Sequence, residues 1–307
     1  MSSKRLRADL ALTFCALIWG ATFVLVKDAL ADVSVVVYIA VRFSLAAAVL
    51  GILFWNSVRR LKLPTVMAGV QIGAAMFGGY IFQTTGLKFT TPAKAAFITG
   101  SCVVLVPLLL ALFGRRRITG WIWAGAAAAL AGLYFLTVPS SGLGGLNRGD
   151  PIVFLCAVSF ALHIILIGRH VGDHSVGGLA FLQVATTAGL SALLVPIMAV
   201  AGWERPRLVL SGTAISAILI TAIGSTVIGF SFQTWAQRHT SPSHTAILIS
   251  LEPVFAALTS WILVRERFGA RTLAGAGLIL AGILIAELMG PAPPAPESPE
   301  PVAQPLD

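Results

Sequence analysis

Long runs of apolar residues, separated by short polar connections, dominate this chain. A helix that spans a bilayer needs about 20 consecutive, mostly apolar residues. Ten segments meet this requirement, and we expect each of them to form a transmembrane helix. They cover residues 10–29, 34–54, 65–86, 91–113, 119–138, 150–169, 176–201, 212–235, 241–264 and 270–289. The pattern therefore predicts an all-α polytopic membrane protein.

The apolar pattern is duplicated within the chain. Residues 79–132 match residues 229–282 without a gap, at an offset of 150 positions. Ahead of this block, an offset of 141 places Trp19 on Phe160. Each copy holds five predicted helices, and because five is odd the second copy must enter the membrane from the opposite side. We therefore expect ten transmembrane helices, arranged as two inverted five-helix repeats around a central cavity. Identical pairs include Gly79/Gly229, Gln83/Gln233, Thr84/Thr234, Pro92/Pro242, Gly125/Gly275 and Gly132/Gly282.

The connections divide the chain into parts. Residues 1–9 form an expected cytoplasmic segment, and residues 10–138 form the first five-helix repeat. A connecting loop rich in Ser and Gly, residues 139–149, leads to the second repeat at 150–289. The tail at 290–307 is rich in Pro and mildly acidic, a composition typical of disorder.

The composition excludes a soluble globule. Hydrophobic residues make up 57% of the chain and charged residues only 11%, against about 25% charge in soluble domains. A net charge of +9 would favour nucleic acid in a soluble protein, but here Lys and Arg lie in short loops, where they set membrane orientation. Their distribution in the first half predicts a multi-pass protein of the cell inner membrane with both termini in the cytoplasm.

No motif of an enzyme occurs in the sequence. We find no His-Glu-x-x-His, no Gly-x-Ser-x-Gly, no P-loop and no paired His/Cys cluster. Cys15, Cys102 and Cys156 lie inside apolar segments at spacings that do not suit a metal, so we interpret them as packing residues. We expect no catalytic residue, no cofactor and no metal site.

Two charged residues stand out well inside predicted spans, where a central charge costs about 2.5–3.5 kcal/mol on insertion scales and normally faces protein or a wet cavity. Glu252 directly precedes Pro253, which we expect to kink the helix there. Glu252 is a candidate for proton coupling or for binding a substrate amine; the alternative is a structural acceptor at the kink or an ion-pair partner. Arg42 is a candidate for binding a carboxylate, and the alternative is that it holds the fold together.

Aromatic and polar side chains recur at helical spacing inside the predicted spans. The groups are Trp19 with Phe23, Phe77 with Tyr80 and Gln83, Phe160 with His163, and Phe230 with Gln233. The pairs that match across the repeat are Tyr80/Phe230, Gln83/Gln233 and Lys94/His244. The first member of each pair lies toward the outer side and the second toward the inner side. Related polar residues at both mouths of one path are what alternating access requires.

Small residues recur on the fifth and tenth predicted helices. Such residues let helix backbones approach one another in a membrane, so we interpret both helices as scaffold or dimer contacts. The residues are Gly125, Ala126 and Gly132 on the fifth helix and Gly275, Gly277 and Gly282 on the tenth.

Several motifs resemble the EamA family of the drug/metabolite transporter (DMT) superfamily. They are Trp19-Gly20-Ala21-Thr22-Phe23, Arg42-Phe43, Thr91-Pro92-Ala93-Lys94-Ala95-Ala96, Leu251-Glu252-Pro253-Val254 and Arg265-Glu266-Arg267. The resemblance extends from Asp9 to about Leu288 and implies a central cavity lined by the first, third, fourth, sixth, eighth and ninth helices. The chain looks most similar to the YddG-like exporters of aromatic amino acids, which also handle methyl viologen. It departs from that pattern at Lys94, a position where relatives more often carry a small or amide residue.

These observations predict a secondary active or facilitative transporter that exports amino acids, including aromatic ones, and related small metabolites by alternating access. Arg42 or Lys94 would bind the substrate carboxylate, and Glu252, Gln83 or Gln233 the amine. The expected partners are a small-molecule substrate and the lipid bilayer, with no nucleic acid, and the protein would be a monomer or weak homodimer. The candidate substrate-binding residues are Trp19, Phe23, Arg42, Phe77, Tyr80, Gln83, Lys94, Phe160, His163, Phe230, Gln233 and His244, with Glu252 for proton coupling or amine binding.

Two other functions remain open at this point. A multidrug or lipophilic-cation exporter would make Glu252 central, because a cation must meet an anion. A lipid-handling flippase would need a lateral groove between helices and no paired gates.

Overall fold

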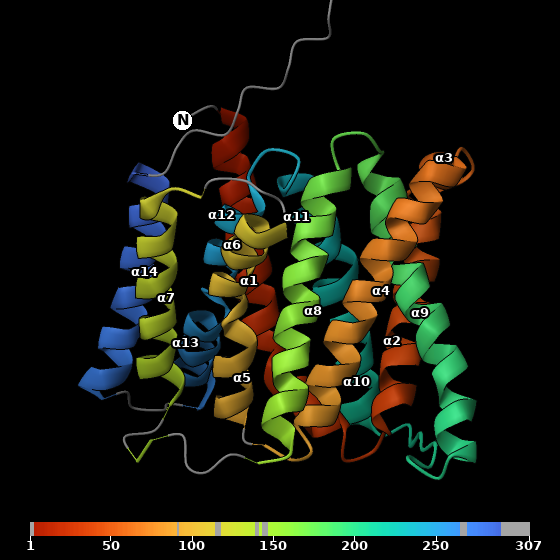
Figure 1. Ribbon diagram of the computed structural model, residues 1–307. Helices are drawn as coiled ribbons and strands as arrows, with labels where there is room; N and C mark the ends of the chain where they lie inside the picture. Colours follow the sequence, from red (N-terminus) through yellow and green to blue (C-terminus); the bar gives the residue numbers. More distant parts are fainter. Residues whose placement is uncertain are drawn as a thin grey trace, which may run out of the picture.

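The computed structural model describes residues 3–90, 92–113, 118–138, 141–142, 147–264 and 269–289. Within these ranges the regular structure is helical, and the helical runs lie side by side with the chain reversing direction between them (Figure 1). The predicted disordered tail at 290–307 lies outside the described residues. The helices are α1 (Ser3–Ala29), α2 (Val35–Leu53), α3 (Trp55–Val58), α4 (Leu63–Gly86), α5 (Pro92–Gly100), α6 (Cys102–Phe113), α7 (Gly120–Thr137), α8 (Gly149–His170), α9 (Val176–Val200), α10 (Gly212–Ile220), the π-helix η1 (Thr221–Ile228), α11 (Gly229–Ala236), α12 (Pro242–Ile249), α13 (Glu252–Val264) and α14 (Ala270–Met289).

Six helices in the described part are long and apolar enough to cross a bilayer, which confirms a polytopic membrane protein. Most helix ends agree with the hydropathy pattern to within two residues. α1 is the exception, because it begins at Ser3 and carries its polar first turns beyond the predicted start at residue 10. The six are Val35–Leu53, Leu63–Gly86, Gly120–Thr137, Gly149–His170, Val176–Val200 and Gly212–Ala236.

Two predicted spans are each divided into two helices. The first breaks at Ser101, between α5 and α6, and the second at Ser250 and Leu251, between α12 and α13. The hydroxyl of Ser101 donates to the carbonyl of Ile98 at 2.6 Å. In the same way, the hydroxyl of Ser250 donates to the carbonyl of Ile247 at 2.5 Å. Such back-bonding competes with the helical pattern.

The sequence predicted a kink caused by Pro253. The helix does break near this residue, but proline is not the cause. Pro253 is the second residue of α13, in the first turn, where a missing N–H costs nothing. The first copy breaks at the equivalent place with Val103 at the matching position. The break belongs to both halves and does not require proline.

The helix at Gly212–Ala236 is continuous but changes its hydrogen-bond pattern in the middle. Residues Thr221–Ile228 form the π-helical segment η1 between α10 and α11. The amide of Gly229 donates to the carbonyl of Gly224, five residues earlier. The helix that matches it at an offset of 150, α4, is α-helical from Leu63 to Gly86.

α7 and α14 pack against one another through their glycines. A Cβ added to Gly125 would lie 2.7 Å from the carbonyl oxygen of Gly282, and one added to Gly132 would lie 2.6 Å from that of Gly275. The backbones therefore touch, as the small residues predicted. Gly277 does not take part, since no atom lies within 4 Å of its added Cβ.

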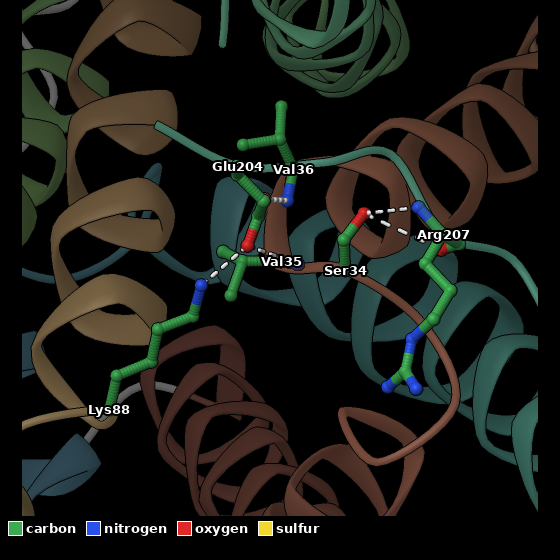
Figure 2. A network of polar contacts seen from close by, with 6 residues as sticks. All are labelled: Ser34, Val35, Val36, Lys88, Glu204 and Arg207. Atoms are coloured by element: carbon green, nitrogen blue, oxygen red, sulfur yellow. Dashed lines mark hydrogen bonds and ion pairs between the residues drawn. The ribbon is translucent and has the colours of Figure 1, made fainter. Parts of the chain in front are cut away.

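A polar clamp ties three connections together at the end of the bundle opposite the N-terminus, the lower end in Figure 1. Figure 2 shows the carboxylate of Glu204, in the α9–α10 connection, accepting from the amides of Val35 (3.3 Å) and Val36 (3.0 Å) at the start of α2. Lys88, after α4, donates to the same carboxylate at 2.5 Å. Glu204 thus satisfies two unpaired donors of the α2 N-terminus. We call these four residues the Glu204 clamp.

The charge of Glu204 is stabilised by this arrangement. Partial burial by itself raises the pKa of its carboxyl group, but the ammonium of Lys88 and the two α2 amides lower it more. The pKa of Glu204 consequently lies below its ordinary value of 4.5.

Candidate substrate cavity

A cavity of about 430 Å³ lies within the helical bundle. Its walls come from both halves of the chain, and its size falls in the range of about 300–1,000 Å³ that is typical of small-molecule sites. Nine of the thirteen candidate residues from the sequence line it. They are Trp19, Arg42, Tyr80, Gln83, Phe160, His163, Phe230, Gln233 and Glu252.

The cavity reaches toward one end of the bundle. Its wall includes Leu136 and Thr137, which end α7, and Thr272, near the start of α14. Figure 1 shows both helix ends at the end opposite the N-terminus. Near the N-terminal end, by contrast, Leu12 and Leu248 belong to a buried apolar cluster and are not part of the cavity wall.

Arg42 brings a cation into this apolar environment from the middle of α2, with only 4% of its surface exposed. Its Nε donates to Oγ1 of Thr226 at 3.0 Å, and its Nη2 lies 3.4 Å from the hydroxyl of Tyr80. The guanidinium carbon is 5.0 Å from the centre of the Tyr80 ring and 5.3 Å from that of Phe43, a cation–π arrangement. No carboxylate pairs with Arg42 among the described residues. A buried cation without a counterion leaves a strong attraction for an anion.

Aromatic rings form one connected wall around the cavity. Tyr80 and Phe230 lie at the centre of this wall, and the centroids of their rings are 6.2 Å apart. Edge-to-face and tilted contacts of this kind add to the burial of apolar area. The further centroid distances are 4.9 Å for Tyr80–Phe43, 5.5 Å for Tyr80–Phe160, 5.3 Å for Phe230–Trp19 and 5.6 Å for Phe230–His163.

Trp19 is held by a hydrogen bond from its indole nitrogen and by close packing against a glycine. Its Nε1 donates to the carbonyl of Ser225 in η1 at 2.9 Å. The ring lies against Gly229, where an added Cβ would come within 2.8 Å of Nε1. Thr22, one turn later on α1, shares a hydrogen bond of 2.8 Å with the hydroxyl of Ser225.

Acceptor groups without partners face the same cavity. The carboxylate of Glu252 has no hydrogen bond or ion pair in the described part of the chain. Oε1 of Gln233 is buried and has no donor there either. Buried acceptors of this kind normally find a partner in a ligand or water.

His163 is fixed by a relay that the sequence did not reveal. Thr234 donates to the carbonyl of Phe230 at 2.6 Å, so its oxygen accepts from Nε2 of Gln183 at 2.9 Å. Oε1 of Gln183 then accepts from Nε2 of His163 at 2.8 Å. This network places the imidazole proton on Nε2. A signal was present, since the offset of 141 aligns Gln183 with Arg42.

Four candidates are not placed in the cavity wall. Phe77 is partly buried on α4 but is not part of the wall. His244, near the N-terminal end, lies 3.1 Å from Oδ1 of Asp9 on α1. The side chains of Phe23 and Lys94 lie outside the described residues.

The cavity also contains hydroxyl groups that the sequence analysis missed. Ser, Thr and small residues in an apolar span look like packing residues, and no pattern separated these from the others. They include Thr22, Thr99, Thr137, Ser225, Ser250 and Thr272.

Comparison with known proteins supplies the family. A model of the EamA-like transporter family matches residues 6–138 and again residues 147–288. An uncharacterized transporter of Archaeoglobus fulgidus is 37% identical over 290 residues, which cover 93% of this chain and 87% of that protein. The threonine/homoserine exporter RhtA of Escherichia coli K12 is 28% identical over 232 residues, 75% of this chain and 70% of RhtA. A solved crystal structure shares the fold with a TM-score of 0.76 and 23% identity, covering 92% of this chain and 97% of that one. This chain belongs to the EamA-like transporter family.

Proposed function

We propose that this protein exports amino acids, including aromatic ones, and related small metabolites across the inner membrane by alternating access. One observation carries the proposal: a single cavity contains the buried guanidinium of Arg42, the unpaired carboxylate of Glu252 and an aromatic wall. An amino acid presents a carboxylate, an ammonium and a side chain, and each has a complementary group here. The exporter named for threonine and homoserine among the relatives supports this substrate class.

The proposed architecture is ten membrane crossings in two inverted five-helix repeats, with both termini in the cytoplasm. Two contacts support the inversion. Gly79 packs on Phe160, and Gly229 packs on Trp19. Offsets of 150 and 141 exchange these two pairs with one another. An exchange of partners between halves is the relation expected of a two-fold axis in the membrane plane.

With this orientation the structure corresponds to an outward-directed cavity. The wall reaches the outer helix ends at Thr137 and Thr272, while Leu12 and Leu248 pack together on the cytoplasmic side. Export then requires an alternative state in which α1 and α12 separate, and the contact of Asp9 with His244 must break in that state.

The test is flux of labelled phenylalanine and threonine in proteoliposomes. Glu252→Gln is expected to lower flux about tenfold or more, because it removes the anion that meets the substrate ammonium. Glu204→Gln is the matched control: the same change outside the cavity, expected to keep flux near the wild-type level. The proposal fails if wild-type flux of every amino acid equals that of empty liposomes, or if Glu252→Gln and Glu204→Gln transport equally.

The unpaired carboxylate of Glu252 also favours a second candidate, a lipophilic-cation exporter. Methyl viologen would then compete with tryptophan for the same flux. Arg42→Gln separates the two functions, because it removes the group that meets a carboxylate and leaves the group that meets a cation. Retained methyl viologen flux with lost tryptophan flux would show one cavity that serves both substrates.

Coupling to protons is part of the proposal at Glu252, with His163 as the other titratable candidate in the wall. Flux into liposomes should then respond to a pH gradient imposed across the bilayer. A flux that is indifferent to this gradient would make the transport facilitative.

A further inference from the structure

The π-helical segment η1 lies against one face of α2. Tyr38 and Arg42 are four residues apart, so they share that face. The hydroxyl of Tyr38 lies 2.9 Å from Oγ1 of Thr221, and Nε of Arg42 lies 3.0 Å from Oγ1 of Thr226. The two threonines are five residues apart, which is the hydrogen-bond interval of a π-helix. Two side chains one turn apart on α2 therefore contact two side chains one turn apart on η1.

The direction of each hydrogen bond in this contact is determined. The hydroxyl of Thr226 donates to the carbonyl of Thr221 at 3.0 Å, so its oxygen is free to accept from Arg42. Thr221 likewise donates to the carbonyl of Ala217 at 2.6 Å and accepts from Tyr38. An arginine has five N–H donors, and the contacts with Thr226 and Tyr80 use two of them.

The same segment also orients Trp19. In an α-helix the amide of Gly229 would donate to the carbonyl of Ser225, but here it donates to the carbonyls of Gly224 and Thr226. The carbonyl of Ser225 is thereby released from its α-helical partner and accepts from the indole of Trp19 at 2.9 Å. Gly229 carries no side chain, which leaves the space that the indole occupies.

We propose that η1 positions Arg42, the one cation among the described residues of the cavity wall, for binding a carboxylate. Within η1, Thr226 is the positioning residue. Thr226 is fully buried and is not part of the cavity wall, so it acts through the guanidinium. Because Thr226 accepts from Nε, the two terminal nitrogens of Arg42 are the edge left for the cavity, and that edge can bind a carboxylate in a bidentate manner. The inference deepens the proposed function and rests on it: the substrate class is a molecule with a free carboxylate.

The first half of the chain has no equivalent device. Met76 stands at the position that matches Thr226, and Gln183 at the position that matches Arg42. Met76 is fully buried in an apolar cluster, and Gln183 bonds to His163 and Thr234. The carboxylate site is therefore single, although the frame around it is duplicated.

The experiment compares two ligands that differ in the carboxylate, L-phenylalanine and phenethylamine. Binding to the full-length protein in lipid nanodiscs and flux in proteoliposomes are measured for wild type, Thr226→Val and Thr226→Ser. Valine keeps the shape of threonine without the hydroxyl, and serine keeps the hydroxyl. Thr187→Val is the control, because Thr187 is a buried hydroxyl that bonds to backbone carbonyls on α4 and α9, away from the cavity wall.

Thr226→Val is expected to weaken L-phenylalanine binding about tenfold or more, the usual effect of losing a hydrogen bond to a charged group. Phenethylamine binding should stay within about twofold of wild type, Thr226→Ser should behave as wild type, and Thr187→Val should leave the ratio of the two affinities unchanged. If Thr226→Val does not assemble, Thr226→Ala removes the same hydroxyl with less bulk and has the same expected result.

Two results would overturn the positioning role while wild-type amino-acid flux stays intact. One is Thr226→Val binding both ligands as wild type does, and the other is equal weakening of both ligands, which a general packing defect would produce. Absence of wild-type binding and flux for every amino acid is a different failure. It would overturn the proposed function and the carboxylate substrate class with it.

Discussion

Helix α4 and the helix built from α10, η1 and α11 occupy equivalent positions at an offset of 150, and their residues match from Gly79 and Gly229 onward, yet the two helices differ in the middle. α4 is regular, and Gly79 contacts the ring of Phe160, which has no hydrogen-bond donor. Its counterpart is π-helical before Gly229, which contacts Trp19. The indole of Trp19 donates to a carbonyl that the π-helix releases.

The comparison distinguishes the contacts that set the spacing of the helices from the contacts that hold polar side chains. Both halves keep the close contact of a glycine with an aromatic ring, because that contact sets the distance between helices. Only the second half adds the hydroxyl of Thr226 and the free carbonyl of Ser225, and these hold Arg42 and Trp19. Duplication accounts for the contacts that both halves share, and local divergence in one helix accounts for the polar contacts that only the second half makes.

The largest expected effect comes from making Arg42 like its counterpart Gln183. Arg42→Gln removes a buried charge that a substrate carboxylate would pair with. The ratio kcat/KM for amino-acid flux should fall about 100-fold, as when one partner of a buried charge pair is truncated. Arg42→Lys keeps the charge without the planar fork and should lie between the two. Flux within threefold of wild type for Arg42→Gln would contradict the comparison.

Adding a methyl group at the two matched glycines is the next largest perturbation. Gly229→Ala puts its Cβ 2.8 Å from Nε1 of Trp19, which is tied to Ser225 and has little freedom to move. We expect a loss of about 1–3 kcal/mol in stability, as for other overpacked sites. In Gly79→Ala the close atoms belong to one side of the Phe160 ring, the nearest 2.6 Å away, and this ring has no hydrogen bond that restrains it, so the loss should be smaller.

Thermal unfolding in detergent measures both glycine variants, with Gly277→Ala as the control because no atom lies within 4 Å of its added Cβ. An equal loss for Gly79→Ala and Gly229→Ala would show that the tether of Trp19 contributes nothing.

Trp19→Phe makes the two halves alike and should have a smaller effect. The phenyl ring keeps most of the packing on Phe230 but loses the donor to Ser225. We expect a loss of about 1 kcal/mol, the net value of a typical hydrogen bond, and a severalfold rise in KM. Trp235→Phe is the matched control, because the indole nitrogen of Trp235 makes no hydrogen bond to the described residues. Equal unfolding temperatures for the two variants would remove the hydrogen bond as a factor.

The smallest effect is expected at the connections. Lys88 pairs with a carboxylate in the Glu204 clamp, whereas its counterpart Arg238 donates to the backbone carbonyl of Gly172 at 3.3 Å. Because the pKa of Glu204 is lowered in the folded protein, its contribution is complete above the ordinary value of 4.5 and is lost as the pH falls through the lowered pKa. Exposure of Lys88 keeps this contribution below about 1 kcal/mol.

A pH series of unfolding temperatures measures this clamp. Glu204→Gln should remove the acid-induced loss that wild type shows, and Arg238→Met should leave it unchanged. A wild-type loss that persists in Glu204→Gln would assign it to other carboxyl groups.

Much of the cavity wall was predictable because membrane spans place strong limits on polar residues. A charge, an amide or an imidazole inside an apolar segment is costly unless it faces protein or a wet cavity, so Arg42, Glu252 and Gln233 stand out by residue type alone. Residues such as Ser225 and Thr226 do not, since a hydroxyl in a membrane helix usually bonds to its own backbone. The break before Pro253 was predicted, but its presence in the copy without that proline shows that composition alone assigned the wrong cause.

The sequence by itself determined the membrane setting, the positions of the helices and the duplication, because hydropathy, segment length and residue matches are local or one-dimensional properties. Only the tertiary structure decided which candidates meet. His244 pairs with Asp9 away from the cavity, and Gln183 joins His163 and Thr234 from a third helix. The tertiary structure also revealed the π-helical turn. Whether a backbone amide bonds to the fourth or to the fifth preceding carbonyl depends on what packs beside the helix. The physical reason is that a side chain acquires its role from the groups that surround it, and those groups come from distant parts of the chain.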